Sequence, residues 1–114
     1  MVSTISSSRR AKEDIQDMGE ASAGLYRLRP VTFRYIQPYA DGSKPIDYGL
    51  IAEEVDAVYP DLVVRNTGGE IETVQYHKLV PMLLNELQRQ QRTIDELQHE
   101  LNRLQQTIQA KRMP

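Results

Sequence analysis

The chain has 114 residues, 39% of them hydrophobic, and a formal net charge of −2, which suits one small domain with a modest core and a long solvated element. This charge balance gives no electrostatic basis for wrapping nucleic acid, so no nucleic-acid partner is expected. Cysteine is absent, which excludes disulfides, thiolate zinc sites and a cysteine nucleophile. No apolar run approaches the ~20 residues that span a bilayer and no signal peptide is visible, so no membrane partner is expected.

The first predicted element is a helix that ends before Pro30. Asp17 followed by Glu20 resembles a capping box, the side-chain pair that satisfies free N–H groups at a helix start. The apolar residues behind it recur at helical spacing: Met18, Ala21, Leu25 and Leu28. A half-buried strand is predicted next over residues 31–36, where apolar and polar residues alternate. The loop "YADGSKP" follows, with Asp41-Gly42 as its turn.

The middle of the chain predicts a strand, a helix and a hairpin. "YGLIAEEVDAVYP" indicates a short strand leading into a helix that Pro60 closes, with four residues facing inward: Leu50, Ile51, Val55 and Val58. Two apolar runs at 62–65 and 71–75 flank "NTGGE", whose paired glycines supply positive φ for a hairpin turn. Because the elements are short, mixed and not repeated, the predicted fold class is α+β.

The C-terminal third carries a heptad repeat. Position a holds Val80, Leu87, Ile94, Leu101 and Ile108, and position d holds Leu83, Gln90, Leu97 and Leu104. Four heptads without an internal glycine or proline after Leu84 predict a coiled-coil helix roughly 45–50 Å long. The alternative is a helix folded back on the domain, which is disfavoured because a domain this short is too small to cover the whole seam.

The number of strands in the coiled coil stays open between two and three from periodicity alone. Isoleucine at a with leucine at d suits dimers, but two a positions hold leucine and Gln90 is a polar layer that sets the register. The g and e positions hold mostly glutamine and few opposite charges, so interhelical ion pairs are scarce: Glu86, Thr93, Glu100, Gln91, Gln98 and Gln105.

The body of the chain shows no convergent catalytic set. His99 falls at the solvated f position of the coiled coil, and His77 is more simply a surface or capping residue at the start of the long helix. Glu53 and Glu54 are neighbours whose side chains point apart on a helix, so solvated surface is the simpler interpretation. Gly68-Gly69 is a lone pair in a turn, not a phosphate loop. No metal or cofactor is predicted.

Four blocks together resemble a known family. They are "SSRRAKEDI", "LYRLRPVTFRY", "YGLIAEEVDAVYPDLV" and "VQYHKLVPMLLNELQ", in that order along the chain from Ser7 to about Leu97. This arrangement is similar to the intramolecular chaperone auto-processing domain that ends phage tail spikes, tail fibres and endosialidases, and to a related domain of myelin regulatory factor.

The resemblance implies a self-cleaving chaperone. Such domains trimerise, assist the folding of the fibrous protein before them and then cut themselves off before a serine, using a lysine five residues later. On this chain the nucleophile is then Ser7, the base is Lys12 and the scissile bond is Ser6–Ser7. The family usually has aspartate after the nucleophile, where this chain has Ser8, which makes Ser8 a competing candidate. Glu53, in the third block, is a weak candidate for supporting the site.

Regular backbone does not bring Ser7 and Lys12 together. Five residues place two side chains about 140° apart on a helix and on opposite faces of a strand. A lysine base also needs a pKa lowered from ~10.4 toward neutrality, which nearby cations such as Arg9 and Arg10 favour and nearby acids oppose. Either a bend joins the dyad, or the lysine comes from a neighbouring subunit, which would make cleavage conditional on assembly.

The resulting interpretation divides the chain into three parts: a residual upstream segment (1–6), an α+β chaperone core (7–78) and a trimerisation helix (79–112). We expect a homotrimer that associates with the fibrous domain upstream in its own precursor, a virion tail protein made in the host cytoplasm and later freed of this domain. From composition alone, Ser6–Ser8 would be a helix cap or leader. The alternatives are a structural trimerisation and capping module that does not cut, and release of a transcription factor.

Overall fold

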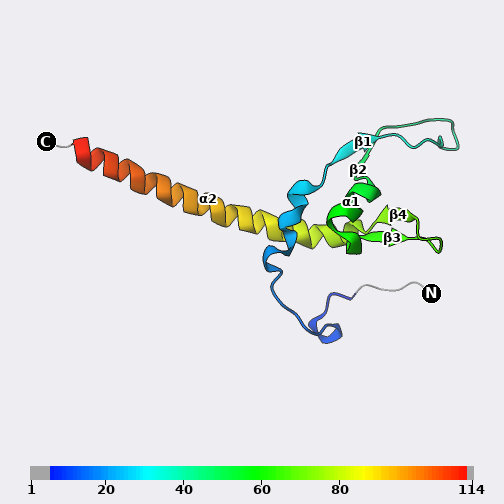
Figure 1. The fold of residues 1–114 in the computed structure, drawn as a ribbon, viewed down its shortest axis with the longest axis horizontal. Coiled ribbons are helices and arrows are strands. Elements are labelled where there is room, and N and C mark those ends of the chain that lie inside the picture. Colours follow the sequence, from blue (N-terminus) through cyan, green and yellow to red (C-terminus); the bar gives the residue numbers. More distant parts are fainter. Residues whose placement is uncertain (1–5, 113–114) are drawn as a thin grey trace.

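A computed structural model describes residues 6–112 of the chain. Figure 1 shows a small body at one end of a long helix that projects far beyond it. The molecule measures 76 × 42 × 25 Å with a radius of gyration of 21.9 Å, whereas a compact domain of this length would have a radius near 13 Å. Most of the long helix therefore receives no cover from its own chain.

The elements confirm the mixed α+β class, and their two sheets are both two-stranded and antiparallel, β1 with β2 and β3 with β4. Three of the helices, labelled η, are of the tighter 3-10 type. In chain order the elements are η1 (Arg9–Ala11), η2 (Gly19–Arg27), β1 (Val31–Phe33), β2 (Asp47–Gly49), α1 (Ala52–Val58), η3 (Pro60–Leu62), β3 (Val63–Arg65), β4 (Ile71–Val74) and α2 (Tyr76–Arg112).

The first predicted helix is present as η2, but its predicted capping box is wrong. The cap is Met18, which makes no side-chain hydrogen bond to the helix end. Gly19 follows with φ of 61°, a left-handed turn that places Asp17 ahead of the cap position. The start of η2 is nevertheless tied to α2, because the side chain of Asn85 donates to the Gly19 carbonyl at 2.9 Å.

The strand predicted over 31–36 ends earlier, at Phe33. Beyond it Tyr35 is half exposed and stacks edge-on against the Phe33 ring, with centroids 5.0 Å apart. The predicted turn is confirmed: Gly42 has φ of 82°, and the Asp41 carboxylate accepts from both the backbone N–H and the hydroxyl of Ser43. These two bonds, the hydroxyl first, hold the pKa of Asp41 below its usual range.

The predicted hairpin is also confirmed, as β3 and β4 with an irregular register between Val64 and Arg65. Only one of its paired glycines takes positive φ, Gly69 at 84°. The turn is shaped instead by Asn66, whose side-chain oxygen accepts from the N–H groups of Gly68 and Glu70 at 2.9 Å each. An asparagine that mimics backbone in this way removes the need for a second left-handed residue.

The core is small and lies where α1, the second hairpin and the first turn of α2 meet. Its buried members are Val55, Leu62, Val63, Val74 and Leu79. Of the four residues predicted to face inward from 48–60, Val55 is the most buried, and Leu50, Ile51 and Val58 are partly covered. A core of this size stabilises the body only modestly, since each fully buried side chain contributes about 1.5–3 kcal/mol.

The long helix α2 begins at Tyr76, four residues before the first predicted heptad position. Its first turns pack on the body through Leu79 and Glu86, which are both buried. The apolar a and d residues are exposed, from 47% at Leu104 to 67% at Val80. The single chain therefore shows the predicted unpaired seam, and α2 projects away from the body rather than folding back over it (Figure 1).

Candidate functional site

The predicted cleavage junction lies in a short, self-contained turn. The Ser8 side chain caps η1 by accepting from the Arg10 N–H at 3.4 Å, and the Ser6 hydroxyl accepts from the Ser8 N–H at 3.3 Å. Backbone bonds from Ala11 and Lys12 to the Ser8 and Arg9 carbonyls close the turn at 3.1 Å each. Ser8 thus acts as the helix cap, a position that serine favours, and Ser6 forms a local turn with it.

Ser7 and Lys12 flank this turn. Ser7 is exposed and precedes the cap, and Lys12 is an exposed residue with extended backbone at the end of η1. A one-turn 3-10 helix between them is the kind of bend that a five-residue spacing requires. Among residues 6–112 no hydrogen bond joins Ser7 to Lys12. The assignment of the two residues as a dyad stays a prediction.

The junction turn stands apart from the body. Every residue from Arg9 to Asp17 is exposed, and Asp14 takes a left-handed φ of 55° as the chain turns toward η2. In Figure 1 this dark-blue segment curves away from the long helix. The N-terminal residues 1–5, most of the predicted upstream segment, lie outside the described part of the chain.

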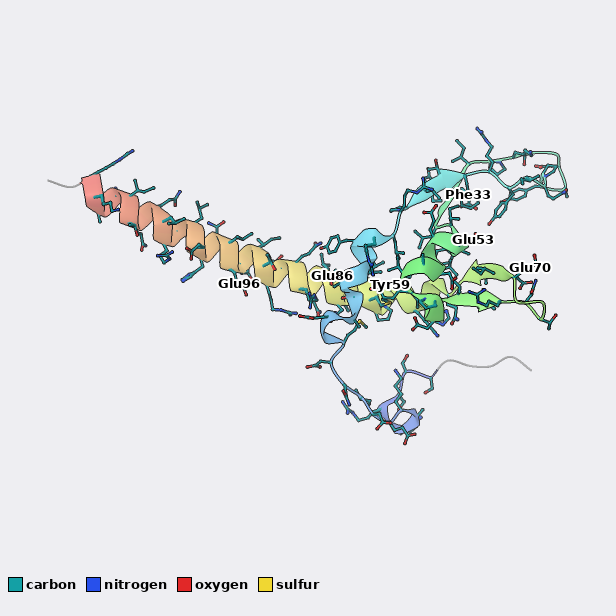
Figure 2. The ribbon with its side chains drawn as sticks, viewed as in Figure 1. Phe33, Glu53, Tyr59, Glu70, Glu86 and Glu96 are labelled. Carbon is teal, nitrogen blue, oxygen red and sulfur yellow. The ribbon has the colours of Figure 1, made fainter. Side chains whose placement is uncertain are left out.

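Glu53, the predicted supporting residue, lies elsewhere in the single chain. It is exposed in the first turn of α1 and lines a hollow of about 270 Å³ together with Phe33, Tyr35 and residues 71–74 of β4. Figure 2 places Glu53 above the long helix, whereas the junction turn lies below it. The structure therefore does not bring Glu53 and the junction together in the single chain.

Beside Glu53, the neighbouring Glu54 links α1 to the segment before β1. Both nitrogens of one edge of the Arg29 guanidinium contact the Glu54 carboxylate, at 3.2 and 2.6 Å. This bidentate pair holds the pKa of Glu54 below its ordinary value and raises that of Arg29. Glu54 therefore has a structural partner, which the expectation of a solvated helix surface did not include.

A polar cluster that the sequence did not reveal joins η2 to α2. Ser22 is fully buried, donates its hydroxyl to Glu86 at 2.8 Å and accepts from Asn85 at 2.7 Å. Arg89 completes the cluster at 3.1 Å from the Glu86 carboxylate. The heptad pattern assigned Glu86 to a partly solvated g position, and only the packing of η2 against this flank buries it.

Tyr76, in the fourth sequence block, has a contact that the sequence did not predict. Its hydroxyl accepts from the Leu50 N–H at 3.0 Å, and a Cβ added at Gly49 would lie 2.9 Å from the same hydroxyl. The third and fourth blocks of the resemblance therefore meet at this contact. An open apolar groove of about 700 Å³ lies beside it, between η2, the first sheet and the start of α2.

Two absences hold for the described part of the chain. No cluster of three or more histidine, cysteine, aspartate or glutamate side chains over residues 6–112 is placed to hold a metal ion. None of the helices that the structure describes is long and apolar enough to cross a membrane.

Comparison with known protein families finds a match over the first half of the chain. The family model Peptidase_S74, chaperone of endosialidase, matches residues 7–64, just over half of the chain. The matched segment begins at Ser7 and includes η1, η2, the first sheet, α1 and η3. A search of curated protein sequences finds no relative of the chain.

Proposed function

The chain belongs to the Peptidase_S74 family, the chaperones of endosialidase, and on that premise we propose that it is an intramolecular chaperone that trimerises, assists the folding of a fibrous protein segment upstream of it and releases itself by cutting the Ser6–Ser7 bond. The observation that carries this proposal is the start of the family match at Ser7, the residue that would become the new N-terminus.

The exposed seam of α2 supports the assembly step. A single amphipathic helix in water leaves its apolar stripe exposed to solvent, and most of a helix's stability in a protein comes from packing that face against a partner. Burying the a and d residues of three copies against one another removes this cost and brings three bodies to the same end of the bundle. Three upstream chains would then be held in register while they fold.

In the proposed cleavage, the Ser7 Oγ attacks the carbonyl carbon of Ser6 and Lys12 accepts the hydroxyl proton. The C–N bond between Ser6 and Ser7 breaks, and Lys12 returns the proton to the departing amine, which leaves an ester between Ser6 and the Ser7 oxygen. Water then hydrolyses this ester to a Ser6 carboxylate and a free Ser7 hydroxyl. A serine needs such a base because its hydroxyl is a weak nucleophile at neutral pH.

The exposed position of the junction turn supports a lysine supplied by a neighbouring subunit. Ser7 and Lys12 are both exposed, so either side chain is accessible to another copy. A dyad completed only in the trimer would delay release until assembly is finished. A dyad within one chain is the alternative, reached by a small change in the η1 turn.

The decisive experiment uses a precursor that carries its natural upstream segment. Intact-mass spectrometry of the wild type should give a fragment that begins at Ser7, and Ser7→Ala should abolish it. Ser8→Ala is the matched control, since it removes the neighbouring hydroxyl and should leave the cut at the same bond. An intact wild-type chain would contradict cleavage and favour a capping module that trimerises without cutting.

Mixed trimers test where the lysine comes from. Ser7→Ala and Lys12→Ala chains are each inactive alone in a dyad mechanism. When the two are co-expressed, cleavage of the Lys12→Ala chains is expected if a neighbour supplies the base, and no cleavage is expected if the dyad lies within one chain.

The setting of the proposal is the tail of a phage or prophage, with the precursor made in the bacterial cytoplasm and the released domain absent from the mature fibre. Detection of the released fragment in infected-cell lysate but not in purified particles would support this setting. An upstream segment with a DNA-binding domain would instead favour release of a transcription factor.

A further inference from the structure

Two hollows lie side by side along the seam of α2, and both are bounded by η2. The first, of about 370 Å³, lies among Tyr26, Gln90 and Ile94. The second, of about 260 Å³, lies among Leu25, Tyr26 and Leu87. Tyr26 and Gln90 border both, so they form one continuous depression with the tyrosine ring as its outer wall. The ring is 63% exposed, although it belongs to the helix that packs most extensively on α2.

The depression lies on one defined flank of the seam. Its floor consists of a and d residues, including Leu83, Leu87 and Ile94, and its edge consists of the g residues Glu86 and Thr93. η2 therefore covers the g flank of α2. The e flank on the other side of the seam, which begins with Leu84 and Gln91, is exposed.

The wall is held rigidly in this position. Ser22, one turn before Tyr26, is fixed to Glu86 by the buried hydrogen bond of 2.8 Å, and Asn85 ties the start of η2 to α2 through the Gly19 carbonyl. A hydrogen bond of 2.8 Å from the Tyr59 hydroxyl to the Ala21 carbonyl holds η2 from the opposite side. A surface fixed on both sides is ready to bind without further ordering, which lowers the entropic cost of association.

We infer that Leu25 and Tyr26 form a side wall of the subunit interface, against which the e flank of α2 from a second copy docks. The inference rests on the proposed assembly, because it places the seam of three parallel helices against this wall. In a parallel coiled coil the g flank of one helix faces the e flank of the next. The depression continues the seam on the g flank, so the e flank of the next copy is its natural occupant.

The chemistry of the two surfaces matches. The e column combines an apolar residue, Leu84, which is 55% exposed, with three glutamines, Gln91, Gln98 and Gln105. Tyrosine offers an apolar ring and a hydroxyl that donates or accepts, which suits a column of leucine followed by amides. Docking would also cover Leu84 of the second copy, which would remain exposed to solvent if only the a and d residues were buried.

This wall gives assembly a direct connection to the junction. η2 is the helix that follows the junction turn along the chain, so docking at Tyr26 would bring the next subunit against the helix from which the junction extends. In a copy without a neighbour Tyr26 is exposed, and in the proposed trimer each Tyr26 would be covered by the next copy.

Concentration-dependent sedimentation equilibrium tests the wall. Tyr26→Ala should weaken assembly about tenfold at each subunit contact, the loss typical of an interface tyrosine. Tyr39→Ala is the control, because Tyr39 is also exposed, at 50%, but lies in the β1–β2 loop away from the seam. Leu97→Ala serves as the positive control on the seam itself. Far-UV circular dichroism of the diluted monomers should show the same body for all four proteins.

The outcomes separate this inference from the proposed function. A wild type that stays monomeric contradicts the trimer. A trimeric wild type that Leu97→Ala weakens and Tyr26→Ala does not would overturn the wall alone. Equal weakening by Tyr26→Ala and Tyr39→Ala would overturn it as well, since the effect would not be specific to the flank.

A cross-link locates the contact. Because the chain has no cysteine, Tyr26→Cys combined with Gln91→Cys presents one thiol on each side of the expected contact. A short bismaleimide should then link copies into covalent trimers. The pair Tyr39→Cys with Gln91→Cys should give no such product, and equal yields from the two pairs would contradict the proposed docking.

Discussion

At the scale of single residues, Gly24 shows how closely η2 approaches the body. A Cβ at this position would lie 2.7 Å from the Tyr59 hydroxyl and 3.2 Å from a methyl of Val58. The same hydroxyl donates to the Ala21 carbonyl, so it cannot move away without losing that bond. The glycine is required here by close approach, since its backbone is not in the left-handed region.

Gly24→Ala should therefore destabilise the body by about 1–3 kcal/mol, the usual cost of overpacking. Urea unfolding followed by circular dichroism measures the change. Tyr59→Phe removes the closest atom of the clash, so the double variant should lose less stability than the sum of the two single variants. Strict additivity would contradict the contact.

At the scale of elements, the buried polar cluster attaches η2 to α2. Glu86 is 8% exposed and has two polar partners from different elements, Ser22 and Arg89. Buried carboxylates are costly unless paired, and removal of one member leaves the others desolvated without a partner. The cluster therefore sets which flank of α2 the helix η2 occupies, a specificity that apolar contacts alone would not give.

Glu86→Ala should lower the free energy of unfolding by about 1–3 kcal/mol, because the buried Ser22 hydroxyl loses its acceptor and Arg89 loses its ion-pair partner. Glu96→Ala on the same helix is the control, since Glu96 is exposed beyond the body (Figure 2) and its removal should change stability little. Chemical denaturation of both variants, at a concentration where the wild type is monomeric, checks the difference. Equal losses would mean that the cluster adds nothing beyond the general role of a helix-surface acid.

At the scale of the whole molecule, the small body buries its own apolar side chains, whereas the long helix leaves its apolar side chains exposed. The body has its own core of five buried apolar side chains, Val55 among them. The helix beyond Arg89 is exposed along its full described length, so its stability depends on other copies. The proposed trimer would satisfy this need, and the side wall at Tyr26 would extend the same interface onto the body.

Ile94→Asp should prevent assembly, because it places a charge in the centre of the seam. Sedimentation should then give the monomer mass of 13.1 kDa, where the wild type is expected to give three times that value. His99→Asp is the control, since it introduces the same residue at an outward f position only a few residues away. An unchanged mass for Ile94→Asp would contradict the seam.

The local sequence predicted most elements correctly for identifiable reasons. Pro30, Pro60 and the turn at Asp41-Gly42 are backbone constraints that act within a few residues, so the elements they bound were found near their true positions. The capping box at Asp17 was wrong because Gly19 turns the chain before the helix starts. Asp17 and Glu20 have the spacing of a capping box, but Gly19 between them adopts a left-handed conformation that prevents the capping geometry.

The site residues were predicted from spacing and resemblance, and the tertiary structure shows the local conformation and the neighbours of each. It shows Ser8 as a helix cap, Ser7 and Lys12 on either side of one 3-10 turn, and Glu53 away from both in the single chain. Ser22 and Glu86 could not be identified beforehand. Their partners are more than sixty positions apart in the chain, and no local pattern reports such a pairing.

The sequence by itself determined the unpaired seam and the order of the elements, because heptad spacing and backbone breakers are local properties that survive in any arrangement of the chain. Only the tertiary structure decided which flank of α2 is covered and which stays free. That choice depends on η2 and α2 meeting through Ser22 and Glu86, a contact between distant segments whose energy exists only after both have folded.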